Sequence, residues 1–86
     1  MSNRNYDRNY MQSILAFNLM RQMEEKKVTV PELAQACDVT TSSIKQLLAG
    51  DQFVGARVLS EICNYLQTNP ASLFQEPNYA EAKTTT

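Results

Sequence analysis

Hydrophobic residues recur along the chain at the spacing of α-helices, in several separate segments. The first segment covers residues 11–27, where apolar side chains repeat every three or four positions: Met11, Ile14, Leu15, Phe17, Leu19, Met20 and Met23. Residues at this spacing share one face of a helix, so we expect them to pack into a core. Two acidic and two basic residues, 24–27, close this helix, with the lysines at the end where the helix dipole favours cations.

The clearest helix start lies at residues 29–32. Thr29 and Glu32 have the spacing of a capping box, in which each side chain accepts a hydrogen bond from the backbone amide of the other residue. Pro31 lies in the first turn, where no hydrogen bond within the helix is lost. The pattern predicts a short helix over residues 30–37, which Asp38 ends.

Three more helices follow in the pattern. The third is capped by Thr40 or Thr41 and runs to residue 49, with Gly50 at its end. The fourth begins at residue 55 and runs to 66, and the fifth covers residues 70–74 after the cap Asn69. No segment alternates as a β-strand does, so we predict an all-α domain over residues 11–74. Residues 1–10, with Arg4 and Arg8, are expected to form a flexible arm, and residues 75–86 a disordered tail apart from docking of Tyr79.

Composition limits the function. A chain of 86 residues, 43% apolar and 20% charged, fits one small soluble domain. The longest apolar run, residues 14–17, is far too short to span a membrane, and no signal peptide is expected. Two cysteines, Cys37 and Cys63, provide neither a disulfide framework nor a zinc-site spacing, which favours small core residues and a reducing cytoplasm.

The chain contains no histidine. This absence excludes the Ser-His and Cys-His nucleophile systems and most zinc and iron sites. No cluster of carboxylates and no glycine-rich phosphate loop replaces them. The sequence therefore argues against an enzyme, and we expect no cofactor and no metal.

The net charge of −1 does not indicate a nucleic-acid partner, so any DNA-binding function must rest on local arrangement. The helices over 30–37 and 41–49, joined by a turn at Asp38, Val39 and Thr40, have the lengths of a helix-turn-helix. The outer face of the second helix is small and polar: Thr41, Ser42, Ser43, Lys45, Gln46 and Ala49. Lys45 can approach guanine acceptors or a phosphate, and Gln46 can pair with adenine.

At these positions the chain resembles the Cro/C1-type (Xre-like) helix-turn-helix repressors of phages and bacteria. The resemblance covers about residues 13–74 and is carried by positions in one register: Thr29, Leu33, Ala34, Val39, Thr40, Ser42, Ile44, Gly50, Leu59, Ile62, Leu66 and residues 69–74. It implies a compact five-helix, lambda-repressor-like domain whose third helix reads double-stranded DNA, with Ala34 small where helices 2 and 3 cross. Three features depart from the family pattern: Val30 replaces a common Gln, Asp38 replaces the usual Gly, and residues 51–54 replace a commonly basic loop.

The resulting hypothesis is a repressor that binds a palindromic operator as a homodimer and blocks the polymerase. Its expected DNA contacts are Thr29, Thr40, Thr41, Ser42, Ser43, Lys45, Gln46 and Arg57, where Arg57 is either a phosphate clamp or a plain surface charge. Its expected dimer contacts are Tyr65, Leu73 and Phe74, where Phe74 is either a dimer contact or a residue that closes the core of the monomer. The alternative is a protein-binding module on the same fold, as in an antitoxin or a phage anti-host factor, which uses Phe53, Val54 and the tail. The Phe53–Val54 pair itself could belong to the core, to a dimer contact or to a partner site.

Overall fold

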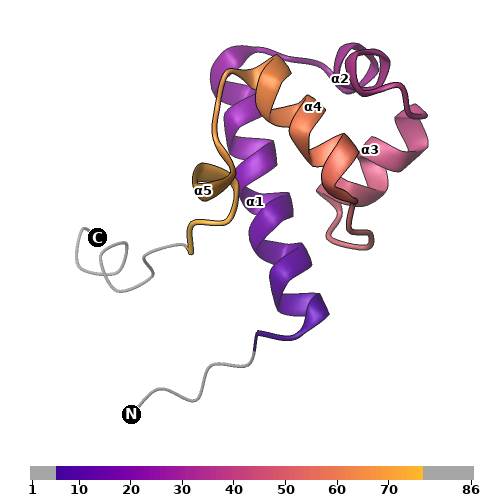
Figure 1. The fold of residues 1–86 in the computed structure, drawn as a ribbon. Coiled ribbons are helices and arrows are strands. Elements are labelled where there is room, and N and C mark those ends of the chain that lie inside the picture. The colour runs from indigo at the N-terminus through magenta and orange to yellow at the C-terminus, as the bar shows by residue number, and fades with distance from the viewer. Residues whose placement is uncertain (1–5, 77–86) are drawn as a thin grey trace.

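The computed structural model describes residues 6–76, which form an all-α domain. Its helices are α1 (Arg8–Lys26), α2 (Val30–Cys37), α3 (Thr41–Leu48), α4 (Ala56–Leu66) and α5 (Pro70–Leu73). The long α1 contacts α3, α4 and α5, while α2 packs on α3 and α4 (Figure 1). No strand occurs among the described residues, and the predicted fold class is confirmed.

The helices begin where the capping signals predict. The Thr29 hydroxyl accepts from the Glu32 amide at 3.3 Å, and the Glu32 carboxylate accepts from the Thr29 amide at 3.0 Å, which completes the capping box. Asn69 caps α5 in the same manner through the Ser72 amide, at 2.9 Å. Short polar side chains therefore satisfy amide groups that the first turn of a helix leaves unpaired.

The beginning of α1 differs from the prediction. Residues 8–10 were expected in a flexible arm, but α1 begins at Arg8, because the Asp7 side chain accepts from the Tyr10 amide at 2.9 Å and caps the helix. Asp7 is a good N-cap residue, and this signal lies outside the apolar stripe on which the prediction relied. Arg8 is thus held in a helical first turn, while Arg4 lies outside the described residues.

One continuous core joins all five helices. Leu15, Leu19, Leu33, Leu47 and Leu73 are each 0% exposed. The predicted stripe of α1 is therefore buried in its main row, but two of its predicted members are not: Phe17 is 53% exposed and Met20 is 45% exposed. At about 100° per residue, positions 17 and 20 lie on the side of α1 opposite Leu15, so helical geometry places them in solvent.

Polar side chains of α1 bind the segment that follows α5. Asn18 is 2% exposed, and its side-chain amide donates to the backbone carbonyls of Leu73 at 2.9 Å and Gln75 at 2.8 Å. The Tyr10 hydroxyl donates to the Glu76 carboxylate at 2.5 Å. Residues 75 and 76 are therefore held on α1 and belong to the folded domain, whereas they were predicted to start a disordered tail. The rest of that tail, including Tyr79, lies outside the described residues.

Candidate nucleic-acid interface

A tight turn sets the angle between α2 and α3. Asp38 ends α2 in the left-handed conformation, at φ 57°, and the Val39 amide donates to the Ala34 carbonyl at 3.0 Å. Val39, the apolar residue of the turn, is partly buried against the core. Ala34 is 2% exposed where α2 contacts α3. A small side chain at this position lets the two helices approach closely.

The helix α3 has one buried side and one polar side. Ile44 and Leu47, at 1% and 0% exposure, face the core. The opposite side consists of exposed residues from the predicted set: Thr41, Ser42, Lys45, Gln46 and Ala49. The sequence-based division of α3 into core and outer faces is therefore correct for these residues.

Two of the predicted contact residues on α3 are used to cap the helix. The Thr40 hydroxyl oxygen accepts from the Ser43 amide at 3.0 Å and lies 3.0 Å from the Ser43 hydroxyl, to which it donates. Ser43 is half-buried. These hydroxyl groups fix the start of α3, so Thr41 and Ser42 are the freer hydroxyl residues of its first turn.

Thr29, another predicted DNA contact, is also used as a helix cap, at the start of α2. Its hydroxyl and its amide both bond to Glu32, and the Tyr65 hydroxyl of α4 donates to the other Glu32 oxygen at 2.5 Å. The Tyr65 hydrogen bond, followed by the one from the Thr29 amide, lowers the pKa of Glu32 below its usual value. The same hydrogen bond raises the pKa of Tyr65. Sequence reasoning missed this pair, because nothing in the local pattern connects residues 33 positions apart.

Arg57 lies in the first turn of α4, beside the end of α2. Its guanidinium donates to the Cys37 carbonyl at 3.2 Å and so satisfies a carbonyl group that the helix end leaves free. The side chain is nevertheless exposed, and a guanidinium carries five N–H donors, so further donors remain for an outside acceptor. This contact joins the α2–α3 unit to α4.

These elements match a known kind of domain. The sequence model of the Cro/C1-type HTH DNA-binding domain matches residues 18–75, which is most of the described chain. The chain belongs to this family. Neither the curated proteins nor the solved structures contain a match to the chain. The family assignment confirms the resemblance found in the sequence, and the matched range includes α2, the turn and α3.

In this Cro/C1-type domain, Gly50 follows the end of α3 and lies beside α1. Gly50 adopts φ 78°, a backbone conformation that favours glycine, as predicted for the end of α3. A Cβ atom there would lie at ordinary van der Waals distance, 3.9 Å from the Ser13 Cα and 4.0 Å from the Ala16 Cβ, so the backbone conformation and not a lack of space favours glycine. Next to it, a polar recess of about 460 Å³ is lined by Arg8, Asn9, Gln12 and residues 50–53. The recess brings Arg8 to the segment that follows α3, beside the acidic Asp51.

The predicted dimer contacts do not form one surface in the Cro/C1-type domain. Leu73 is 0% exposed and belongs to the core, so its assignment to a dimer contact is wrong. Tyr65 is 41% exposed but bonds to Glu32, on the side of α4 opposite Cys63. Phe74 is partly buried, and its ring centroid lies 6.0 Å from that of Phe53, which is 42% exposed.

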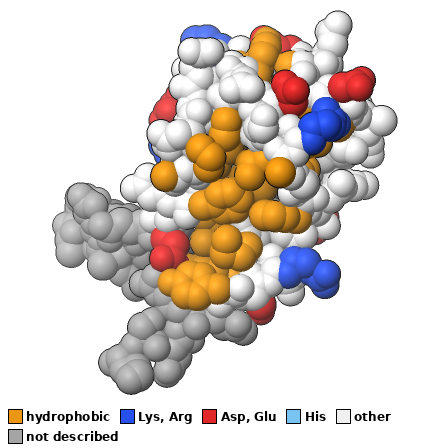
Figure 2. All heavy atoms as spheres, viewed as in Figure 1, with side chains coloured by type: hydrophobic (Ala, Val, Ile, Leu, Met, Phe, Trp, Pro, Cys, Tyr) orange, Lys and Arg blue, Asp and Glu red, His pale blue; other side chains and the backbone are white. Residues whose placement is uncertain are grey.

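A different apolar surface is exposed instead. Figure 2 shows hydrophobic side chains gathered in a band over α4, between α5 and the α3–α4 segment. We define this α4 band by the Phe53–Phe74 pair and a shallow apolar hollow of about 310 Å³ whose hydrophobic lining residues are Ala56, Leu59, Cys63 and Pro70. Val54, next to Phe53, is half-buried against the core.

The two thiols have no visible reactive environment. Cys37 is 0% and Cys63 8% exposed, both are free, and burial raises the pKa of each thiol. Within the part of the chain that the structure describes, no three His, Cys, Asp or Glu side chains gather as metal ligands. Across the same residues, no helix has the length and apolar character needed to cross a membrane.

Proposed function

We propose that this Cro/C1-type domain is a sequence-specific transcriptional regulator that inserts α3 into the major groove of an operator. The observation that carries the proposal is the exposed outer face of α3, which is small and polar between two well-capped helix ends. Bulky apolar groups are absent from this face among the described residues, so α3 can approach base edges. No chemistry and no cofactor are required, because occupancy of a promoter suffices to repress it.

Each proposed contact has a distinct role. Lys45 and Gln46 are fully outward on α3 and read bases or hold a phosphate. Thr41 and Ser42 offer hydroxyl groups to the backbone. Thr40, Ser43 and Thr29 act mainly by fixing the helix starts whose amides face the phosphates. Arg57 combines its bond to the end of α2 with a phosphate contact through its remaining donors.

We further propose that the regulator binds a palindromic site as a homodimer, through the α4 band. One domain offers few cations to DNA, chiefly Lys45, Arg57 and Arg8, and the net charge is −1. Each neutralised phosphate contributes a salt slope of roughly 0.9, so a monomer would bind weakly at physiological salt. A two-fold axis doubles the contacts and reads half-sites about 34 Å apart. The free thiols suit the reducing cytoplasm in which such a repressor would act.

The DNA-reading role is tested with fragments selected from a random DNA pool. Gln46→Ala should cost about 1–3 kcal/mol of affinity and relax the preference at one base position. Lys45→Ala should reduce the salt slope by roughly 0.9 if the side chain holds a phosphate, and relax base preference if it reads guanine. Both residues are exposed, so melting temperatures should not change. Unchanged affinity of both variants for the selected fragments would contradict the role of α3.

A second candidate function is a protein-binding module on the same fold. The exposed Phe53 and the acidic balance of the chain favour it, since the α4 band could hold a protein instead of a second copy. Mobility shifts on random DNA over a range of salt concentrations separate the two functions. A regulator shows binding that weakens steeply with salt, and a pure protein-binding module shows none.

A further inference from the structure

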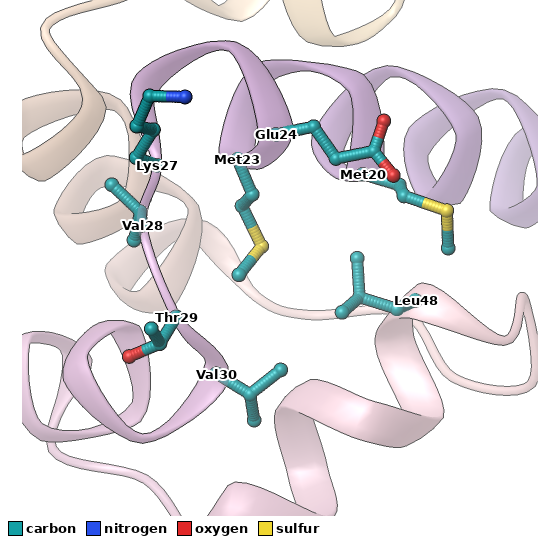
Figure 3. Close-up of a pocket in the computed structure, with 8 residues that line it drawn as sticks. All are labelled: Met20, Met23, Glu24, Lys27, Val28, Thr29, Val30 and Leu48. Carbon is teal, nitrogen blue, oxygen red and sulfur yellow. The ribbon is translucent and has the colours of Figure 1, made fainter.

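A second apolar hollow, which shares no lining residue with the α4 band, lies where the end of α1, the start of α2 and the end of α3 meet (Figure 3). It has a volume of about 430 Å³, and its floor is formed by Met20, Met23, Val28, Val30 and Leu48. In Figure 3 the side chains of Met23, Val30 and Leu48 point into the same space from three different helices. We call this hollow the Met20 groove.

The apolar surface continues beyond the groove along α1. Met20 is 45% exposed, and Phe17, one turn before it, is 53% exposed. Residues 17, 20 and 24 fall at i, i+3 and i+7, so they form one row on the outer side of α1. The core of the domain leaves Phe17 and Met20 of this row exposed, and exposed apolar side chains next to an apolar groove favour an interaction site.

The rim of the groove carries one acidic and one basic side chain that form no ion pair within residues 6–76. Glu24 and Lys27, one helical turn apart, both line it. Within residues 6–76 neither side chain makes an ion pair or a hydrogen bond, although Arg21 and Glu25, one residue further around α1, are paired at 3.4 Å. An apolar floor with an anionic and a cationic group in sequence along its α1 edge is complementary to an amphipathic surface that carries the opposite order of charges.

We propose that the Met20 groove binds an amphipathic helix of a protein partner. The helix would place one aliphatic or aromatic side chain between Met23, Val30 and Leu48, and a second one over Met20 and Phe17. A basic residue of the helix would face Glu24, and an acidic residue would face Lys27. Two methionines suit this role, because their flexible side chains adapt to the anchors that enter.

A helix fits the groove better than a small ligand does. The polar groups of the groove lie at its rim, and its apolar surface extends over Phe17, well past the volume that one small molecule would fill. The groove is separate from the proposed DNA contacts except at Thr29, so Lys45→Ala, which weakens DNA binding, should leave partner binding unchanged. Failure of the DNA-reading proposal and failure of this one are therefore distinguishable.

The probe is a displayed library of helical peptides of about 15 residues, roughly four turns, with one face randomised, selected on the full chain. Peptides enriched on the parent should carry apolar anchors at i and i+3 or i+4, with a basic residue beside them. Their affinity, measured by fluorescence anisotropy, should fall about tenfold or more with Met20→Glu. It should stay unchanged with the matched control Gln35→Glu, which adds the same charge at an exposed position of α2 outside the groove. Methyl resonances of Met20 and Met23 should shift on peptide addition.

The variant Glu24→Lys tests the charged rim of the groove separately from its apolar floor. Selection on this variant should replace the basic residue of the enriched peptides with an acidic one, while circular dichroism shows the same fold. Three results would overturn the proposal: no enriched sequence family, enriched peptides that ignore Met20→Glu, or an unaltered peptide charge after Glu24→Lys. Sedimentation of the parent and of Met20→Glu tests whether the groove instead binds a second copy of the chain. If this variant alone loses self-association that the parent shows, the groove holds a second copy of the chain and the proposal is wrong.

Discussion

Ala34 is the residue that controls how closely α2 and α3 approach. Its side chain is 2% exposed between the two helices, so extra methylene groups have no free space. We expect Ala34→Leu to lower the free energy of unfolding by about 1–3 kcal/mol, because overpacking forces the helices apart. Urea titration of the variant measures this loss. Ala49→Leu, which adds the same atoms to an exposed position, should be nearly neutral, and equal stability of both variants would contradict a close crossing.

The Glu32–Tyr65 hydrogen bond connects α2 to α4 and makes stability depend on pH. The Tyr65 hydroxyl lowers the pKa of Glu32, so the carboxylate's contribution is fully present above its ordinary value of 4.5. It is lost as the pH falls through the lower pKa of the folded state. The pKa of Tyr65 is raised, so its contribution is present below the ordinary value of 10.0 and is lost as the pH rises through the raised value.

Tyr65→Phe isolates this effect. The variant lacks the hydroxyl that favours ionised Glu32, so we expect its free energy of unfolding at pH 7 to be lower than that of the parent. Between pH 5 and pH 3 this free energy should fall less in the variant than in the parent. Urea titrations at these pH values provide the comparison. Glu32→Gln is the control, since it removes the titrating group and should flatten the same part of the profile. A parallel pH dependence of parent and Tyr65→Phe would show that the bond does not stabilise the fold.

At the scale of elements, the turn between α2 and α3 contains backbone strain. Asp38 has φ 57°, a conformation that costs most side chains about 1–2 kcal/mol and glycine very little. Its carboxylate also lies at the C-terminal end of α2, where the helix dipole favours cations. We therefore expect Asp38→Gly to raise the free energy of unfolding by about 1 kcal/mol. Thermal unfolding of the variant tests the increase.

Asp38→Asn separates the two causes. Asparagine keeps a side chain in the left-handed conformation and removes only the charge. If backbone strain dominates, Asp38→Asn should raise the free energy of unfolding by only a minor part of the increase that Asp38→Gly gives. A full gain with Asn would assign the effect to the charge at the helix end, and a loss with Gly would mean that the Asp38 side chain supports the turn.

The sequence predicts these elements well where local rules govern them. The capping box at Thr29, the end of α2 at Asp38 and the terminator Gly50 are each decided by neighbours in the chain, and the structure shows all three. The outer face of α3 follows from the same periodicity. Phe17 and Met20 were misplaced because apolar character alone did not reveal that Asn18 is buried instead. The burial of Asn18 depends on carbonyl groups at the end of α5, and contacts this distant leave no local pattern.

The interface could be predicted only in part for the same reason. That Lys45 and Gln46 point outward follows from the 3.6-residue period of α3. The bond from Arg57 to the Cys37 carbonyl depends on how α4 docks against α2, which the sequence does not display. Leu73 was predicted as a dimer contact because the end of the fourth helix and the following short helix carry apolar residues. In this fold the Asn18 side chain binds the end of α5 and holds Leu73 in the core.

At the scale of the whole molecule, the α4 band is the surface on which a dimer is expected. Ala56 is the best position to test it, because this residue is exposed in the band and lies in the first turn of α4. A glutamate there removes no buried group and is favoured by the helix dipole. Ala56→Glu should therefore keep the fold and melting temperature while it places a charge in the dimer contact.

Sedimentation of the parent and Ala56→Glu, with a palindromic operator and with a single half-site, measures the result. The parent should assemble as a dimer on the palindrome, and Ala56→Glu should bind as a monomer with about half the salt slope, since half as many phosphates are neutralised. Gln35→Glu adds the same charge to an exposed position of α2 outside the band and controls for simple repulsion from DNA. A parent that remains monomeric on the palindrome, or a Gln35→Glu variant as impaired as Ala56→Glu, would refute assembly through the α4 band.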